Sequence, residues 1–381
     1  MIRAEHLSDP SSGDSPTIIG RLSRLNWVAI SSLMALCLIG VIMLYSAAGG
    51  SFTPWAHKQL LRLALGVTLM LLCSLVDIRT WMMWSYPLYI VSLLLLVAVE
   101  LMGYIGMGAQ RWINLGLFNL QPSELMRIAI VLVLARYFHN VDVIEARKLK
   151  SLVIPLILII MPVILVLKQP DLGTAVILIL NGVALFFVVG VQYWKFAISG
   201  ASVLAAIPII WNQMHLYQKK RVFAFINPES DPKNSGYHVI QSKIAIGSGG
   251  IFGKGFMQGT QGQLNFLPEK QTDFIFTMIA EEFGMLGGVV LVGLYMIIMT
   301  YGYKVAITTR HQFGRLVAFG MTTTVFLYAF INMAMVMGLL PVVGVPLPFV
   351  SYGGTALLTL LIGQGLIFST AIHHDKRIGR L

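Results

Sequence analysis

Long, unbroken apolar runs recur along this chain, and the first of them extends from Trp27 to about Ala48. An α-helix needs about 20 apolar residues to cross a lipid bilayer, and these runs approach that length. Only 11% of the 381 residues are charged and 57% are hydrophobic, whereas soluble globular domains carry about 25% charged residues. A soluble or disordered protein is therefore excluded. An outer-membrane barrel would instead show short segments of alternating hydrophobicity.

Ten such runs are predicted to be spanning helices, so the expected fold class is an all-α polytopic membrane protein with about ten transmembrane helices. One long loop, about residues 214–272, separates two of them, and a loop of that length in a compact protein usually has a function. Residues 1–26 are polar and predicted to form a disordered cytoplasmic tail, residues 27–373 the membrane domain, and residues 374–381 a second tail. The predicted spans are about 27–48, 60–76, 82–101, 124–139, 151–167, 172–190, 195–213, 273–300, 316–337 and 353–372.

The distribution of Lys and Arg predicts the orientation in the membrane, because short cytoplasmic loops are enriched in both. The side that carries the two termini holds 15 of them, and the short loops of the other side hold 4. Both termini are therefore predicted to be cytoplasmic, and the long loop to face the periplasm. The net charge of +11 follows from this pattern, so it does not indicate nucleic-acid binding. Two cysteines, Cys37 and Cys73, lie inside apolar runs and offer neither a disulfide framework nor a metal site.

Charged residues inside or beside the predicted spans need an explanation, because an ionisable group in a span costs about 2.5–3.5 kcal/mol on insertion scales. Glu124 and Arg127 are three residues apart and share one helix face, where they can pair. They form either a structural ion pair or one wall of a polar site, with Arg111 nearby as an anion ligand. Asp171 follows a turn and either caps the next helix or belongs to the same site.

A second group of polar residues lies where the long loop meets the following span. Asp273 sits at that boundary, where it either caps the helix or acts as a carboxylate in a site. Glu281 and Glu282 follow within the same apolar run and are predicted to face a polar cavity or a basic partner.

The segment 341–355 contains three prolines and three glycines and cannot form a regular span. Irregular backbone at membrane depth is tolerated where it lines protein or water. Its turn at Ser351 and Tyr352 can offer backbone N–H groups to an anion. Together, these segments predict an outward-facing cavity with Asp273 as its carboxylate and Arg111, Arg221 and Lys243 as anion ligands. The expected substrate is anionic and partly lipidic.

Four spaced motifs carry a family resemblance. They are Gln121-Pro122-Ser123-Glu124, Gln169 to Thr174, Leu267-Pro268-Glu269 with Thr272 to Phe276, and the set Asn332, Gly338, Pro341, Gly344 and Ser351 to Ala356. The chain resembles, from about residue 27 to 373, the SEDS proteins of bacteria (shape, elongation, division and sporulation). Residues 236–250 and 259–261 are similar to the elongation branch, the RodA-like members. Arg127 departs from the family, which usually has Lys there, and the two are not interchangeable.

The resemblance implies a peptidoglycan glycosyltransferase of the bacterial inner membrane that polymerises lipid II, a disaccharide-pentapeptide on undecaprenyl pyrophosphate, during elongation. It implies that the family's essential carboxylate is Asp273. It also implies a class B penicillin-binding protein as partner, bound through that partner's transmembrane helix, and the elongation machinery. No cofactor is certain, and a divalent cation that assists the pyrophosphate is left open.

We expect an inverting transfer in which Asp273 is the general base for the acceptor 4-hydroxyl group, with a pKa raised by a partly desolvated cleft. Arg111, Arg221 and Lys243 would neutralise the leaving pyrophosphate. A lipid II flippase is the alternative, and ten spans with an intramembrane ion pair are compatible with it. A scaffold that only recruits the penicillin-binding protein would leave the carboxylates unexplained.

Overall fold

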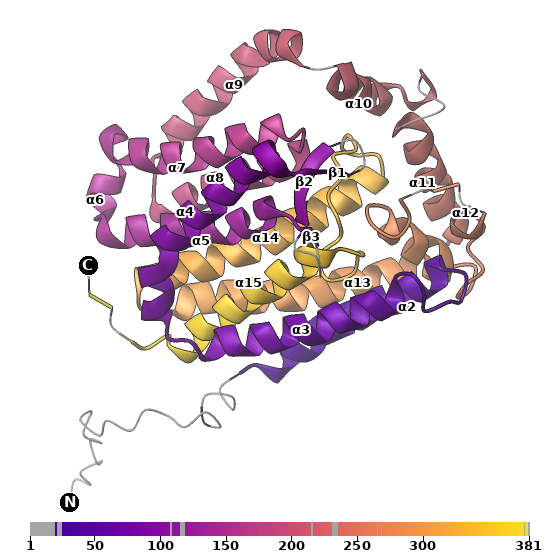
Figure 1. Cartoon of the computed structure of the whole chain (residues 1–381), viewed down its shortest axis with the longest axis horizontal. Helices are drawn as coiled ribbons and strands as arrows, with labels where there is room; N and C mark the ends of the chain where they lie inside the picture. Colours follow the sequence, from indigo (N-terminus) through magenta and orange to yellow (C-terminus); the bar gives the residue numbers. More distant parts are fainter. Residues whose placement is uncertain are drawn as a thin grey trace, which may run out of the picture.

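The computed structural model of the chain is a bundle of long helices, with most of the shorter elements at one end and α6 at the other (Figure 1). It describes residues 20, 25–106, 109–114, 119–214, 216–230, 235–264, 266–267, 269–376 and 378–379. Most of the predicted tail 1–26, and residues 377 and 380–381, lie outside the described residues. The elements are α2 (Trp27–Ala47), α3 (Ala56–Leu75), α4 (Ile78–Met102), β1 (Tyr104–Gly106), β2 (Ala109–Asn114), β3 (Asn119–Leu120), α5 (Pro122–Asn140), α6 (Val143–Ala146), α7 (Leu149–Lys168), α8 (Leu172–Val189), α9 (Tyr193–Gln213), α10 (Leu216–Ile226), η1 (Pro228–Ser230), α11 (Ser235–Gly249), α12 (Thr260–Gln263), α13 (Ile275–Thr308), α14 (Gln312–Val336) and α15 (Gly354–Ile372).

Each of the ten predicted spans coincides with one long helix, so the predicted fold class is confirmed. Within the described residues, eight of these helices are long and apolar enough to cross a membrane. The apolar part of α9 is shorter, at residues 193–209. Helix α5 is less apolar because it carries Glu124, Arg127 and Arg136. Charged residues thus lower the hydropathy of the helix that holds the predicted ion pair.

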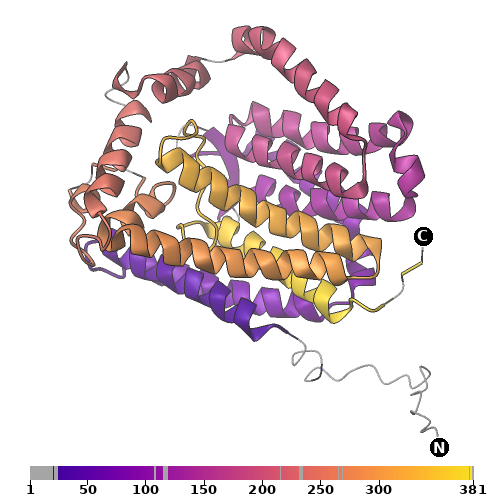
Figure 2. The ribbon, with the colours of Figure 1, turned by 180° about the vertical axis from the view of Figure 1, so that it is seen from behind.

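The start of α2 and the end of α15 lie at one end of the bundle, and α10, α11 and α12 lie at the other end (Figures 1 and 2). The long loop 214–272 is therefore not structureless, because it contains these three helices and η1. Between α4 and α5, the strands form a small antiparallel sheet in the order β1-β2-β3 at the same end as α10 to α12. Strand β2 places Arg111 at that end of the bundle.

Local residue choice explains where several helices begin and end. The side chain of Asn26 accepts a hydrogen bond from the backbone N–H of Ala29 (3.1 Å), and Asp77 accepts one from the N–H of Arg79 (2.9 Å). Both are N-cap contacts that satisfy free backbone donors. Gly190 ends α8 with a φ of 93°, a left-handed conformation that glycine adopts without a steric cost.

The segment between α14 and α15 has no regular secondary structure, as its prolines and glycines predict. Side chains from neighbouring helices bind its backbone carbonyl groups. The Nδ2 atom of Asn332 donates to the carbonyl oxygen of Val345 (2.7 Å), and the Nε2 atom of Gln59 donates to that of Ser351 (3.1 Å). Both side chains are almost fully buried, so the irregular backbone at this depth is satisfied by protein rather than lipid.

Candidate active site

Asp273 lies in the turn that precedes α13, at the end of the bundle where α10 to α12 gather. Its backbone carbonyl accepts a hydrogen bond from Nδ2 of Asn332 (2.8 Å). Its carboxylate lies over Gly344, where an added Cβ would come 3.4 Å from Oδ2. Phe274 is the N-cap residue of α13, and no side chain caps that helix. The capping role considered for Asp273 is therefore absent, and its side chain is available for another task.

The environment of Asp273 raises the pKa of its carboxyl group to about 7, from an ordinary value of 3.8. Burial is the largest cause, because a carboxylate is less well solvated away from water. The negative charges of Glu269 and Asp171 raise the pKa further, and the guanidinium groups of Arg221 and Arg111 oppose them. Among the described residues, no donor hydrogen-bonds to this carboxylate. A carboxyl group that titrates near neutral pH suits general-base catalysis.

The turn between α7 and α8 carries Asp171 and is bound by Arg111, and the charges of both residues act on Asp273. The Nε atom of Arg111 donates to the carbonyl oxygen of Gln169 (3.1 Å), and its Nη2 donates to that of Pro170. Asp171 caps α8 by accepting hydrogen bonds from the N–H and the hydroxyl group of Thr174 (3.2 and 2.8 Å). The capping alternative for Asp171 is thus observed. Its negative charge still acts on Asp273, so capping and membership of the site coexist.

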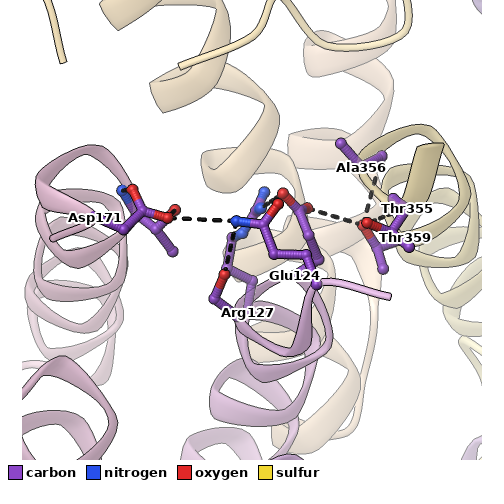
Figure 3. A network of polar contacts seen from close by, with 9 residues as sticks. Glu124, Arg127, Asp171, Thr355, Ala356 and Thr359 are labelled. Carbon is purple, nitrogen blue, oxygen red and sulfur yellow. Dashed lines mark hydrogen bonds and ion pairs between the residues drawn. The ribbon is translucent and has the colours of Figure 1, made fainter. Parts of the chain in front are cut away.

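Glu124 and Arg127 form an ion pair within α5, and each side chain is only 4% exposed. Figure 3 shows this pair in a polar network with Asp171 and Thr359. The hydroxyl group of Thr359 donates to Oε2 of Glu124 (3.2 Å), and the Arg127 guanidinium lies 4.4 Å from the ring centroid of Tyr328. These contacts offset part of the cost of burying two charges, whereas Nε of Arg127 is buried without a hydrogen-bond partner among the described residues. This environment favours the structural alternative for the pair.

Gln121 connects the start of α5, which carries the ion pair, with Asp171. Its Nε2 atom donates to the hydroxyl group of Ser123 (3.1 Å) and lies 3.4 Å from Oδ2 of Asp171. The start of α5 is thereby connected to the start of α8. The Gln121 to Glu124 motif therefore serves as a link between the buried ion pair and the turn beside Asp273.

The remaining predicted cations differ in their surroundings. Arg221 lies on α10 and is partly buried, and its charge lowers the pKa of Asp273. Lys243 lies on α11, is exposed, and packs against Gly338, where an added Cβ would come 2.7 Å from Nζ. Arg111 and Arg221 are thus joined electrostatically to Asp273. Lys243 is placed on the neighbouring surface, and its role stays a prediction.

Ser351 and Tyr352 contact the segment that carries Asp273 through their backbone and hydroxyl groups. The hydroxyl group of Ser351 donates to the carbonyl oxygen of Thr272 (2.6 Å) and accepts from the N–H of Leu347 (2.8 Å). The N–H of Tyr352 donates to the carbonyl oxygen of Gln271 (2.8 Å). These donors are used inside the protein, so the two residues hold the Asp273 turn in place.

Three further residues belong to the site and were not identified as site residues from the sequence. Glu269 raises the pKa of Asp273, and its carboxylate accepts from the hydroxyl group of Thr272 (3.1 Å). Lys270 is almost fully buried, and its Nζ atom donates to the carbonyl oxygen of Gly262 (2.7 Å). Arg62 of α3 lies 4.8 Å from the ring centroid of Tyr352. Glu269 and Lys270 lie four and three residues before Asp273, and this closeness in sequence was a usable signal, whereas Arg62 is distant in sequence.

Among the described residues, no cluster of three or more His, Cys, Asp or Glu side chains is placed to hold a metal ion. The described residues near Asp273 supply Glu269 and Asp171 as further carboxylates.

Comparison with known proteins identifies relatives across almost the whole chain. Residues 26–377 match the family model FtsW/RodA/SpoVE, described as cell cycle protein. The peptidoglycan glycosyltransferase MrdB of Escherichia coli K12 is 44% identical over 342 residues, which are 90% of this chain and 92% of that protein. A probable peptidoglycan glycosyltransferase FtsW of Trichlorobacter lovleyi is 37% identical, covering 92% of this chain and 93% of the relative.

Solved structures are similar over a comparable length. A chain from a peptidoglycan synthase complex that coordinates polymerization and crosslinking matches with a TM-score of 0.80 and 28% identity, covering 92% of this chain and 99% of that chain. The Rod shape determining protein RodA of Thermus thermophilus matches with a TM-score of 0.70 and 27% identity, covering 92% and 98% of the two chains. An Asp-to-Ala mutant of the same RodA matches equally well in TM-score.

Proposed function

Because the chain belongs to the FtsW/RodA/SpoVE family and is a peptidoglycan glycosyltransferase of the inner membrane, we propose that it polymerises lipid II with Asp273 as the general base. The observation that carries this proposal is the state of that carboxylate. It is partly buried, has no hydrogen-bond donor among the described residues, and titrates at about pH 7. Two guanidinium groups act on it electrostatically, which suits a substrate that carries a diphosphate.

The proposed reaction is a single inverting displacement at the anomeric carbon of the donor sugar. The oxygen of the acceptor 4-hydroxyl group forms the new glycosidic bond while its proton moves to the Asp273 carboxylate. The bond between the anomeric carbon and the diphosphate oxygen breaks, and the lipid diphosphate leaves with that electron pair. Asp273 then returns its proton to solvent before the next transfer.

The cations beside Asp273 are proposed to stabilise the leaving diphosphate. Two N–H groups of the Arg111 guanidinium donate to the turn at Gln169 and Pro170, so the side chain is fixed before substrate arrives. Arg221 comes from α10 and approaches from the long loop. Lys243 on α11 is proposed to meet the substrate farther from Asp273. A preorganised charge costs no reorganisation when negative charge develops on the diphosphate.

We further propose the membrane arrangement predicted by the Lys and Arg distribution. Both termini would be cytoplasmic, and Asp273 would face the periplasm, where lipid II is polymerised. The similarity to a chain of a peptidoglycan synthase complex supports a class B penicillin-binding protein as partner during elongation. Contacts with that protein's transmembrane helix are proposed to lie on the lipid-exposed helix faces.

Transport of lipid II across the membrane is the alternative function. The buried Glu124–Arg127 pair at membrane depth is the observation that favours it, because intramembrane charges often mark transport pathways. Purified protein with fluorescent lipid II in detergent micelles separates the two functions. Glycan polymer forms only if the protein is a polymerase, because micelles have no second compartment for a flippase to fill. Absence of polymer under conditions where lipid II binds would favour transport.

The rate of polymerisation is expected to rise with pH through about pH 7 and to level off above it. Asp273 must be deprotonated to accept the proton of the hydroxyl group, and its pKa is about 7. Below that pH, kcat should fall about tenfold for each pH unit, because one proton inactivates the base. Initial rates between about pH 5.5 and 8.5 check this. A profile that is flat or falls with pH across this interval would contradict the assignment.

A further inference from the structure

A loop from the long extracytoplasmic segment replaces two hydrogen bonds inside α13. In an unbroken helix, the carbonyl oxygens of Glu281 and Glu282 would accept from the N–H groups of Met285 and Leu286. Here they accept from the N–H groups of Lys254 and Gly255 instead (both 3.0 Å). The N–H groups of Met285 and Leu286 donate to the carbonyl oxygens of Gly250 and Ile251 (2.9 and 3.1 Å). The loop therefore fills the break in the helix.

Glycines permit this close approach of two backbones. Gly284 has a φ of 65° and forms the kink in α13. An added Cβ there would come 2.4 Å from the nitrogen atom of Gly253. An added Cβ at Gly253 would come 2.1 Å from the carbonyl oxygen of Glu282. Larger residues at either position would separate the loop from the helix.

The side chains of Glu281 and Glu282 hold the same loop. Glu281 is fully buried, and its Oε1 atom accepts from Nζ of Lys254 (2.7 Å), the hydroxyl group of Thr260 (3.2 Å) and the N–H of Gln261 (3.1 Å). Three residues of the loop are thereby bound to one carboxylate oxygen. Removing Glu281 would leave the ammonium group of Lys254 without this partner.

Glu282 makes a second set of contacts that reaches α2. It is 1% exposed, and its two oxygens accept from the hydroxyl group of Ser46 (2.5 Å) and from the N–H of Met257 (3.2 Å). Nε2 of Gln263 also donates to the carbonyl oxygen of Ser46 (3.1 Å). The loop is thus fixed to α13 and to α2 at once.

The contacts continue from this loop to Asp273. Residues 260–263 form α12, and the carbonyl oxygen of Gly262 accepts from Nζ of Lys270 (2.7 Å). Lys270 lies three residues before Asp273, in the same turn. The kink at Gly284 also sets the direction of the first part of α13, at whose start Asp273 lies. The loop therefore determines the position of Asp273 by two routes.

We propose that Glu281 and Glu282 are positioning residues that hold the segment 250–261 in the kink of α13 and thereby fix Asp273 for the transfer. The proposal rests on the proposed role of Asp273 as general base. It explains why two carboxylates are kept within a predicted span, where each is costly. Neither carboxylate touches the reacting atoms.

The test measures kcat and KM for lipid II in Glu281→Gln and Glu282→Gln variants of the full chain. A displacement of a catalytic group by about 1 Å can cost about 10²-fold in rate, so we expect kcat to fall by about that factor while KM changes little. The acid limb of the pH profile should also move to lower pH, because Asp273 becomes more solvated. Glu100→Gln is the matched control, because Glu100 is exposed and pairs with Lys168 at 3.8 Å.

A covalent link tests positioning directly. Ile251→Cys and Leu286→Cys, whose backbones are hydrogen-bonded, are introduced into the Glu281→Gln chain in a Cys37→Ala/Cys73→Ala background. Oxidation should restore most of the lost kcat, and a reducing agent should remove the gain. The link adds no carboxylate, so restoration can only come from the position of the loop.

Several outcomes would overturn the proposal. Unchanged kcat and pH profile in folded Gln variants would show that the loop does not position Asp273. A disulfide that forms without restoring kcat would have the same consequence. Should the Gln variants fail to fold, Ser46→Ala removes one hydrogen bond to Glu282 and keeps both carboxylates, and it must lower kcat too. Normal activity in an Asp273 variant would instead refute the base assignment. The kcat values of the Glu281 and Glu282 variants would still show whether the loop affects the reaction.

Discussion

Replacement of Asp273 by Asn is expected to lower kcat for glycan polymerisation about 10²–10⁴-fold, which is the usual contribution of a general base. Asn keeps the size and shape of the side chain but cannot accept the proton of the acceptor hydroxyl group. The KM for lipid II and the melting temperature should change little, because no described residue hydrogen-bonds to the carboxylate. Product length on gels and initial rates with fluorescent lipid II provide the measurement.

A matched control for this variant lies at the opposite end of the bundle. Asp375 is an exposed carboxylate beside Arg310, and Asp375→Asn should polymerise normally. Polymer formed at a normal rate by the Asp273→Asn variant would refute the base assignment. A loss of activity accompanied by a large fall in melting temperature would show that Asp273 supports the fold rather than the reaction.

Removal of one member of the Glu124–Arg127 pair is expected to destabilise the protein by about 3–5 kcal/mol, because a buried charge loses its partner. Arg127→Met leaves Glu124 almost fully buried with one hydroxyl donor, that of Thr359. The double variant Glu124→Gln/Arg127→Met should recover most of this loss, because no lone charge remains. Unfolding in detergent, followed by temperature or denaturant, measures the difference.

This double-variant experiment also decides between the two interpretations of the pair. A structural pair predicts that the double variant regains both stability and kcat. A pair that serves the reaction predicts regained stability without regained kcat. The exposed pair Lys168–Glu100 is the control, and its removal should change stability by about 0–1 kcal/mol. Equal stability of the single variants and the original chain would contradict the expected cost of a buried lone charge.

The membrane helices could be predicted from the sequence because hydrophobicity over about 20 residues is a local property. Helix α5 is the least apolar of the ten, yet its boundaries were still found because Pro122 suits the first position of a helix. The ends of α3 and α13 were displaced by several residues, since polar residues such as Lys58 continue a helix beyond its apolar part. Hydropathy therefore locates the apolar span, but it does not locate the ends of the longer helix that contains that span.

The contacts that build the site depend on residues far apart in the sequence, and no local pattern reveals them. Asp171 illustrates this, because its two predicted roles both occur once α8 and the Asp273 turn are brought together. Glu281 and Glu282 were expected to face a polar cavity or a basic partner, and Lys254 is that partner for Glu281. The break at Gly284 could not be predicted, because a glycine in an apolar helix usually causes no kink.

The hydrogen bonds that α13 gives up to the loop have a consequence for how the chain is assembled in the bilayer. Residues 250–255 are synthesised before α13, and in the proposed orientation they lie on the periplasmic side of the membrane. Without the loop, four backbone groups of α13 need other partners, namely the carbonyl groups of Glu281 and Glu282 and the N–H groups of Met285 and Leu286. They can pair with one another in an ordinary helical turn, or they remain unpaired in lipid, which is costly. The bent form of α13 therefore requires the loop to lie on the same side of the membrane as the start of that helix.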